Sequence, residues 1–377
     1  MVHGGVSGVS NQRGRAEDFQ QKRDRAQGLL SSKGLSGLVL ASQAGFAWAT
    51  CGADNHVAVA AERGSCTLLL GKDRWYCIAN RVEAPRLKTE ELVGLDFEIV
   101  AHEWFEDPVG DLLEKLCPGP KASDLPTPGC TVMAGEIGQL RWSLTEQEVA
   151  RYREAGRLAA EAMEQAVLAV QPGMSEHEMA ALLSAEVCKR GMVPAVVLIA
   201  ADERIFSYRH PIPTDKRLER YAMLVLVARK WGLHVSLTRF VHFGRVAEEL
   251  RRKQLATARV DAAFIEGTKP GAAVAEVFDA ALRAYAEAGF AEEWHLHHQG
   301  GATGYEPRSY RASPGIAHRV LANQAFAWNP SITGAKSEDT IIATLAGTEV
   351  ISATPRLPVM QVSVGGREWA RPDVLVR

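Results

Sequence analysis

The chain has 377 residues, of which 46% are hydrophobic and 23% are charged, a composition that suits two packed cores. Its formal net charge of -2 provides no basic field for a phosphate backbone, so nucleic acid is not an expected partner. Residues 1–21 contain no apolar run that would form a signal peptide or cross a bilayer, which predicts an irregular start and a cytoplasmic protein.

Six cysteines are spread along the chain without CxxC spacing. This spacing favours neither a zinc knuckle nor a disulfide framework, and reduced cysteines that mostly serve packing are expected. They are Cys51, Cys66, Cys77, Cys117, Cys130 and Cys188.

The first part of the chain predicts a small α/β domain over residues 17–130. A charged helix is followed by short apolar strands and a later helix, over residues 17–33, 35–41, 66–71, 75–79 and 108–116. Residues 117–130 contain six prolines or glycines, which excludes regular structure there and predicts a linker.

The second part, residues 140–377, predicts a larger α+β domain. Two helices begin at capping boxes, Thr145 to Glu148 and Ser175 to Glu178, in which a hydroxyl precedes a carboxylate by three residues. Helices and strands then segregate instead of alternating, which favours an α+β arrangement over a doubly wound sheet. The later helices are expected at 248–266 and 274–288, and the last strands at 324–330, 340–344 and 350–354.

His210 is followed at short distance by two prolines. Proline removes a donor and pushes the preceding residue to extended geometry, so His210 is expected on a loop or a strand end. An imidazole there suits general base catalysis, because its unperturbed pKa is about 6.5. A loop histidine that only bonds to the backbone has the same signature.

Two strand-like segments carry further polar residues. Alternation puts Ser236 and Thr238 on one face of a strand and Arg239 on the other, where it would hold a structural carboxylate or a substrate. Glu338 and Asp339 precede another apolar strand. Because neighbouring strand residues face opposite ways, only one of these two carboxylates can point into a given site.

A histidine-rich segment, residues 294–308, runs into several glycines. As a strand it would point His295 and His297 one way and His298 the other, and no carboxylate accompanies them at ligand spacing, so the metal signal is weak. The glycines allow close approach of the backbone, as on a pocket floor.

Taken in order, these segments resemble the pita-bread family, which includes creatinase, prolidase and aminopeptidase P. The resemblance covers about residues 144–354, and the preceding small domain looks like the creatinase-type N-terminal domain. It implies a pita-bread catalytic domain and a homodimer. The segment His210-Pro-x-Pro-Thr-Asp is similar to the family's active-site histidine loop, which implies a substrate-binding or general-base role for His210.

The resemblance also bears on metal binding, because the peptidases of this family bind two metal ions through two aspartates, one histidine and two glutamates. The corresponding positions here hold Val225, Ser236, Gly301, Asn329 and Glu338. One carboxylate without a positioned imidazole does not offset the desolvation of two hard cations, so no metal cofactor is expected.

Creatinase has this fold and hydrolyses a carbon–nitrogen bond without metal. The resemblance therefore implies a metal-independent hydrolase of amide or amidine bonds in a small polar molecule, with His210 as the base and Glu338 orienting the substrate. Arg308 would pair with a substrate carboxylate or an oxyanion. The other residues expected to bind the substrate are His298, Tyr305, Asn329, Ser236 and Thr238.

Two alternatives stay open. The first is an Xaa-Pro dipeptidase that binds manganese or zinc through other groups, for instance His295, His297 and His298. The second is a catalytically inactive binding or scaffold homologue, which would keep the fold and release its ligand chemically unchanged.

Overall fold

A computed structural model describes residues 12–377. The chain forms two compact units: the first runs to Arg151 and includes Trp231–Leu233, and the second comprises Tyr152–Lys230 and His234–Arg377. The irregular start expected for residues 1–21 lies outside the described residues up to residue 11. From Gln12 onward the chain is helical, five residues earlier than the sequence predicts.

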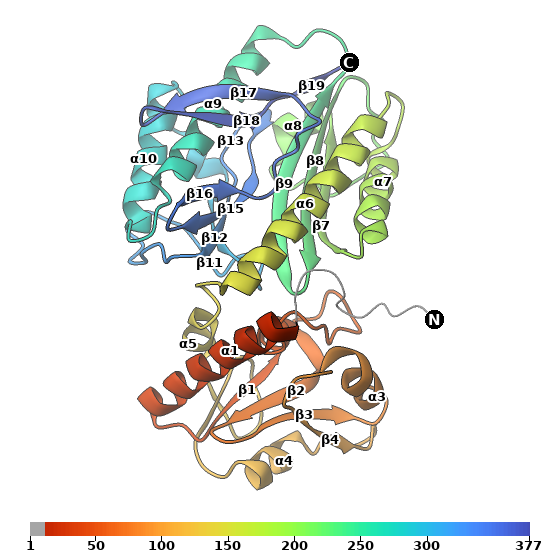
Figure 1. The fold of residues 1–377 in the computed structure, drawn as a ribbon. Helices are drawn as coiled ribbons and strands as arrows, with labels where there is room; N and C mark the ends of the chain where they lie inside the picture. The colour runs from red at the N-terminus through yellow and green to blue at the C-terminus, as the bar shows by residue number, and fades with distance from the viewer. Residues whose placement is uncertain (1–11) are drawn as a thin grey trace. The chain divides into compact units, whose positions relative to one another are not determined.

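The first unit contains a six-stranded sheet with the order β4-β3-β2-β1-β5-β6. Figure 1 labels its strands β1 to β4. Its strands are β1 (Gly37–Ser42), β2 (Arg63–Gly71), β3 (Trp75–Asn80), β4 (Glu98–His102), β5 (Lys121–Ser123) and β6 (Thr131–Val132). Its helices are α1 (Gln12–Lys33), α2 (Gln43–Ala49), α3 (Ala84–Arg86), the π-helix η1 (Leu87–Glu91), α4 (Val109–Leu116) and α5 (Ala134–Gln139).

Strand β5 contradicts the expectation that residues 117–130 hold no regular structure. Lys121–Ser123 pair in parallel with β1, Gly37 lying opposite Lys121. The segment contains prolines at both ends, but Pro120 and Pro126 lie outside the three paired residues. A strand of this length therefore fits between them without losing a ladder hydrogen bond to proline.

The second unit contains two long helices and a mixed four-stranded sheet. Helices α6 (Glu146–Ala169) and α7 (Glu176–Lys189) start at the two predicted capping boxes, and both are confirmed. The Ser175 backbone N donates to Glu178 Oε2 at 2.6 Å, and the Glu178 backbone N donates to Ser175 Oγ at 3.1 Å. The sheet has the order β19-β9-β8-β7, from β7 (Val193–Ala201), β8 (Tyr221–Lys230), β9 (Leu233–His242) and β19 (Leu375–Val376). In this sheet β19 pairs with β9 in parallel and β7 pairs with β8 antiparallel.

A second sheet of this unit has the order β11-β10-β12-β15-β16. Its strands are β10 (Gly300–Thr303), β11 (Tyr310–Arg311), β12 (Gln324–Trp328), β15 (Asp339–Thr344) and β16 (Gly347–Val350). Two hairpins accompany it, β13 (Ser331–Ile332) with β14 (Ala335–Lys336) and β17 (Val359–Val364) with β18 (Arg367–Pro372). The remaining helices are α8 (Glu203–Ser207), α9 (Glu248–Gly267), α10 (Val274–Glu287) and the 3-10 helix η2 (Glu293–Leu296).

A strand was expected at residues 350–354, but strand pairing ends at Val350. The Ile351 backbone N still donates to Thr340 O at 3.0 Å, but the next bonds use a side chain: the Thr340 backbone N donates to Ser352 Oγ at 2.9 Å, and Ser352 Oγ donates to Asp339 Oδ1 at 2.6 Å. A local serine hydroxyl thus replaces the ladder at this point.

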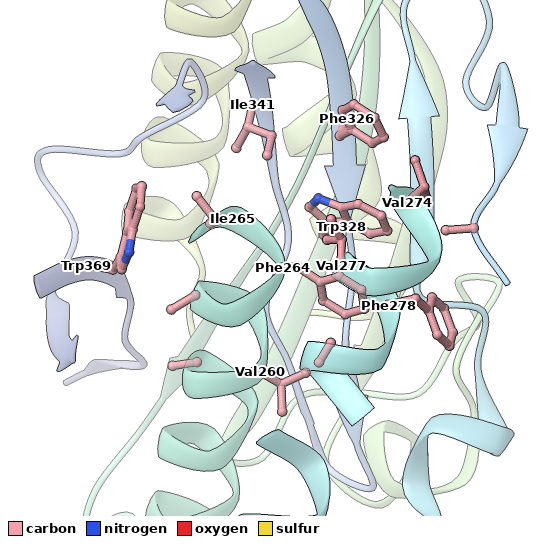
Figure 2. Packing of buried hydrophobic residues seen from close by; sticks show 14 of the residues in the cluster. Val260, Phe264, Ile265, Val274, Val277, Phe278, Phe326, Trp328, Ile341 and Trp369 are labelled. Carbon is pink, nitrogen blue, oxygen red and sulfur yellow. The ribbon is translucent and has the colours of Figure 1, made fainter. Parts of the chain in front are cut away.

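Helices α9 and α10 are held to the second sheet by an aromatic core (Figure 2). The rings of Phe264 on α9 and Trp328 on β12 stack with centroids 4.3 Å apart and an interplanar angle of 14°. Trp328 Nε1 donates to Thr268 Oγ1 at 2.9 Å, so the one polar atom of the indole is satisfied. This packing fixes the end of β12, and with it the segments that carry the polar residues described next.

The six cysteines are free thiols, and Cys51, Cys66 and Cys77 are buried. Among the described residues, every helix is too short or too polar to traverse a bilayer.

Candidate active site

The two sheets of the second unit meet at Glu338. An isolated antiparallel bridge joins Thr238 of β9 to Glu338, with the Thr238 backbone N donating to Glu338 O at 3.1 Å. On one side of this contact Thr238 Oγ1 donates to Glu338 Oε2 at 2.7 Å. On the other side Arg239 Nη2 lies 2.7 Å from Asp339 Oδ1. The expected alternation is confirmed, and Arg239 holds a structural carboxylate.

Two cations face the carboxylate of Glu338, whose side chain is only 3% exposed. Lys336 Nζ lies 2.8 Å from Oε2, and Arg308 Nη2 lies 3.4 Å from Oε1. Burial alone raises the pKa of Glu338, but the charges of Lys336 and Arg308 outweigh it and hold this pKa below its ordinary value. Glu338 is therefore ionised, and each of its oxygens has a cationic partner.

Arg308 connects Glu338 to the neighbouring strand. Its Nη1 donates to Ser236 Oγ at 3.5 Å and to Pro307 O at 2.6 Å. Its Nε is buried without a hydrogen-bond partner in the described part of the chain. The guanidinium thus keeps an unused donor beside a carboxylate, as a site for a further acceptor would.

Three imidazoles converge next to these charges. The Nε2 atoms of His210 and His297 lie 3.1 Å apart, and the ring centroids of His210 and His298 lie 5.5 Å apart. His210 is exposed, whereas His297 is buried. These three residues are the one group of potential metal ligands found among residues 12–377, with ligand atoms within 4.8 Å of one another.

The three imidazoles are neutral at pH 7. Burial, followed by the charge of Lys336, lowers the pKa of His297 and the pKa of His210. Burial and the charge of Arg308 lower the pKa of His298 to about 4. A neutral His210 has a free lone pair and can accept a proton, as a general base must.

The histidine-rich segment does not form the strand that the sequence predicts. Residues 293–296 form the 3-10 helix η2, and the extended geometry begins at His297. His297 and His298 therefore both reach His210, whereas His295 is 55% exposed with Nε2 3.7 Å from Glu292 Oε2. The structure replaces the expected histidine set with His210, His297 and His298.

Asn329 and Tyr305 complete the predicted residues, and each is 2% exposed. Asn329 follows β12, and its backbone N donates to Gln299 O at 3.1 Å. Its Oδ1 is buried and has no hydrogen-bond partner within the described chain. The structure thus gathers His210, His298, Arg308, Ser236 and Thr238 near the carboxylate of Glu338, and it buries Asn329 and Tyr305.

Sequence reasoning missed Lys336 and assigned His297 only to a weak metal signal. Lys336 stands two residues before Glu338 in an extended segment, where residues i and i+2 point the same way. That spacing was a usable signal. The role of His297 was missed because residues 294–298 were predicted to form a strand, whereas the residues before His297 form a 3-10 helix.

The five positions that the family resemblance assigns to metal ligands do not offer the donors for two metal ions. Val225 is an apolar side chain packed in a hydrophobic cluster, and Glu338 already pairs with two cations. Gly301 has φ +148, and a Cβ there would lie 2.3 Å from Tyr310 O, so a histidine does not fit without moving the backbone. Hard cations need several anionic oxygens, and these positions offer only those of Glu338.

The three imidazoles suit a single transition metal by donor type, but their surroundings oppose it. Burial lowers the pKa of His297 and His298 most, and the charges of Lys336 and Arg308, which lower these pKa values further, also repel a dication. In addition, the Gly300 backbone N donates to His298 Nδ1 at 3.3 Å. The lone pair of Nδ1 already accepts this hydrogen bond and is not free for a metal.

The known proteins that are similar to this chain include several peptidases. A model of the Metallopeptidase family M24 matches residues 150–345, more than half of the chain. An uncharacterized peptidase of Staphylococcus aureus is 24% identical over 227 residues, covering 57% of this chain and 64% of the relative. The Xaa-Pro dipeptidase of Pyrococcus horikoshii is 25% identical over 229 residues, covering 58% of this chain and 65% of the relative.

The alignments thus span less than two thirds of the length of these curated relatives. Among solved structures, an Xaa-Pro dipeptidase from Bacillus anthracis has a TM-score of 0.74 at 19% identity, covering 95% of this chain and 100% of that one. This match confirms the predicted fold class, an α+β catalytic domain of the pita-bread type with a smaller N-terminal α/β domain.

Proposed function

Because the chain belongs to Metallopeptidase family M24, we propose that it is a hydrolase that cleaves a carbon–nitrogen bond in a small substrate. The relatives named as peptidases and Xaa-Pro dipeptidases favour a dipeptide amide over the amidine of a creatinase-like substrate. The observation that carries the proposal is the placement of a neutral, exposed His210 beside the buried Glu338 and its two cations.

The proposed chemistry uses side chains alone, since the donor set does not fit the family's metal pair. His210 accepts a proton from water, and the resulting hydroxide attacks the carbonyl carbon of the amide. Arg308, held by Glu338, stabilises the oxyanion with its unused donor. The imidazolium then gives its proton to the leaving nitrogen as the carbon–nitrogen bond breaks.

The test is a substrate panel of Xaa-Pro dipeptides, with creatine and simple amides in parallel. Products are identified by mass spectrometry, with and without added manganese. We expect turnover of at least one dipeptide without added metal, and a loss of about 100-fold or more for His210→Ala. His177→Ala is the control, because His177 is exposed at the start of α7. Unchanged turnover by His210→Ala would remove the assigned base.

A second candidate function is binding without catalysis, which the replaced ligand positions favour. Val225, Ser236, Gly301 and Asn329 stand where this family's peptidases have metal ligands, and Asn329 Oδ1 is buried without a partner. A metabolite that raises the melting temperature of the protein but is recovered chemically intact would support this candidate over the hydrolase.

A homodimer and a cytoplasmic location, both expected from the sequence, are kept as proposals. The dimer rests on the family resemblance alone. Light scattering coupled to size-exclusion chromatography tests it, since a 377-residue chain and its dimer differ twofold in mass.

A further inference from the structure

Lys336 is a buried cation that the proposed chemistry has not yet used. Its side chain is 5% exposed and lies on β14, a two-residue strand paired with β13. Burying an ammonium is costly even when it is paired, and hydrophobic replacements of buried ion pairs are often at least as stable. Stability alone is therefore a weak reason for the presence of Lys336.

The position of Lys336 relates it to the imidazoles as well as to Glu338. Its charge contributes to the lowered pKa of His210, His297 and His298. Lys336 and His297 also line the same small cavity, together with Ser331 and Arg209. Lys336 therefore lies beside His297, whose Nε2 is 3.1 Å from the Nε2 of His210, the proposed base.

Each carboxylate oxygen of Glu338 contacts a different cation. Oε2 faces Lys336 Nζ at 2.8 Å, and Oε1 faces Arg308 Nη2 at 3.4 Å. In the family's peptidases the corresponding glutamate is a metal ligand. The positive charge that metal ions supply there is supplied here by an ammonium and a guanidinium.

We propose that Lys336 is a further catalytic residue, whose ammonium, held in place by Glu338, binds the substrate carbonyl oxygen in place of a metal ion. This inference rests on the proposed hydrolase function. When hydroxide adds to the carbonyl carbon, the carbonyl electron pair moves to oxygen, and the resulting oxyanion is stabilised by Lys336 without proton transfer. The electron pair returns as the carbon–nitrogen bond breaks, and the leaving nitrogen takes the proton held by His210.

The first experiment needs no turnover. A phosphinate analogue of an Xaa-Pro dipeptide carries the tetrahedral oxyanion, and its binding is measured by isothermal titration calorimetry. Lys336→Met alone leaves the buried Oε2 of Glu338 without its cation, so Lys336→Met/Glu338→Gln is compared with Glu338→Gln, after thermal melts confirm that both are folded. We expect about 100-fold weaker binding for the double variant, because one oxyanion donor is commonly worth about 100- to 1,000-fold.

Lys230→Met is the matched control, since Lys230 is partly buried but bonds to the Arg190 and Gly191 carbonyls away from the site. It should bind the phosphinate as the wild type does. Equal binding by the double variant and Glu338→Gln would overturn the role of Lys336.

The second experiment separates this inference from the function on which it rests. With a dipeptide that is turned over, the double variant should lose kcat about 100-fold relative to Glu338→Gln with little change in KM, and Lys336→Arg/Glu338→Gln should recover part of it. Turnover that survives without Lys336 would overturn the inference and keep the hydrolase. Phosphinate binding that depends on Lys336, without any turnover, would keep the anion site and overturn the hydrolase.

A third experiment tests whether a metal ion supplies the positive charge in place of Lys336. The metal content of the purified protein is measured after incubation with manganese or zinc. We expect far less than one ion per chain. One ion per chain that is lost in Glu338→Gln, or in His297→Ala, would show that a metal supplies the charge and would overturn the role of Lys336.

Discussion

The Nε2 atoms of His210 and His297 lie 3.1 Å apart, so a single hydrogen joins the two rings while both are neutral. His297 is buried and lies 3.4 Å from Ser331 Oγ through its other nitrogen, which leaves the exposed His210 as the ring that can turn toward a substrate. The tautomer of the base is therefore coupled to that of a buried neighbour, which also orients the ring of the base, as a carboxylate orients other catalytic histidines.

His297→Ala removes this orienting contact. We expect kcat for a turned-over dipeptide to fall about 10- to 100-fold, because the neutral His210 would lose its fixed tautomer. His295→Ala, an exposed histidine two residues away, should leave kcat unchanged. Equal kcat values for His297→Ala and the wild type would show that His210 does not need this partner.

The stability of the protein should fall in mild acid because of the same histidines. The pKa of His298 is lowered to about 4, against about 6.5 in an unfolded chain, and the pKa of His297 is lowered further by burial and Lys336. A folded state that binds fewer protons is destabilised as pH falls, so the loss begins near pH 6.5 and, for His298, is complete below about pH 4.

Urea unfolding at pH 7.0, 5.5 and 4.5 measures this loss. Carboxylates with lowered pKa values also respond to acid, so the comparison is with His297→Gln/His298→Gln, which should lose less stability over the same range. Parallel curves for the two proteins would contradict neutral, buried imidazoles.

The residues that the sequence placed well are those with local signals. Ser175 and Glu178 cap α7 because a serine hydroxyl and a glutamate three residues later satisfy each other's backbone donors wherever the helix packs. Glu338 and Asp339 were separated correctly by strand alternation alone.

The errors come from tertiary contacts that local pattern does not record. β5 forms because Lys121–Ser123 pair with the edge of β1, and the sequence of residues 117–130 does not indicate this long-range pairing. His297 reaches His210 because a 3-10 turn, not a strand, precedes it. Lys336 pairs with Glu338 and lines a cavity with His297, which is distant in sequence. Only the fold brings these residues together, so the sequence does not indicate a role for Lys336 beside His297.

Gly301 gives a steric test of the metal-ligand comparison. It has φ +148, and a Cβ would lie 2.3 Å from Tyr310 O and 2.8 Å from the Ala312 backbone N. We expect Gly301→Ala to destabilise the protein by about 2 to 4 kcal/mol, because strain and clash with backbone atoms add. Gly301→His, which restores the family's ligand type, should be at least as destabilising.

Gly28→Ala is the matched control, since Gly28 lies inside α1 and a Cβ there meets nothing within 4 Å. Alanine should stabilise this helix by about 0.5 to 1 kcal/mol. If guanidinium unfolding gave Gly301→Ala the same stability as the wild type, the backbone of β10 would be free to move and the steric argument against a histidine would lapse.

A buried ion network behind the site should be far more sensitive than ion pairs at the surface. Asp339 lies 2.7 Å from Arg239 Nη2 and 2.5 Å from Arg371 Nη2, and all three side chains are at most 2% exposed. Arg239 Nη1 also donates to Glu338 O at 3.1 Å, so the network holds the backbone of the site carboxylate. Asp339→Ala leaves two guanidinium groups short of a partner in a dry core, and we expect a loss of about 3 to 5 kcal/mol in unfolding free energy.

Glu349→Gln provides the comparison at the surface, because Glu349 pairs with Arg153 at 2.8 Å while both side chains remain 40% exposed or more. Solvent screens this pair, and its loss should cost less than about 1 kcal/mol. Chemical denaturation of both variants gives the two values. Similar losses would mean that solvent reaches Asp339, and the rigid placement of Glu338 between Lys336 and Arg308 would then need another cause.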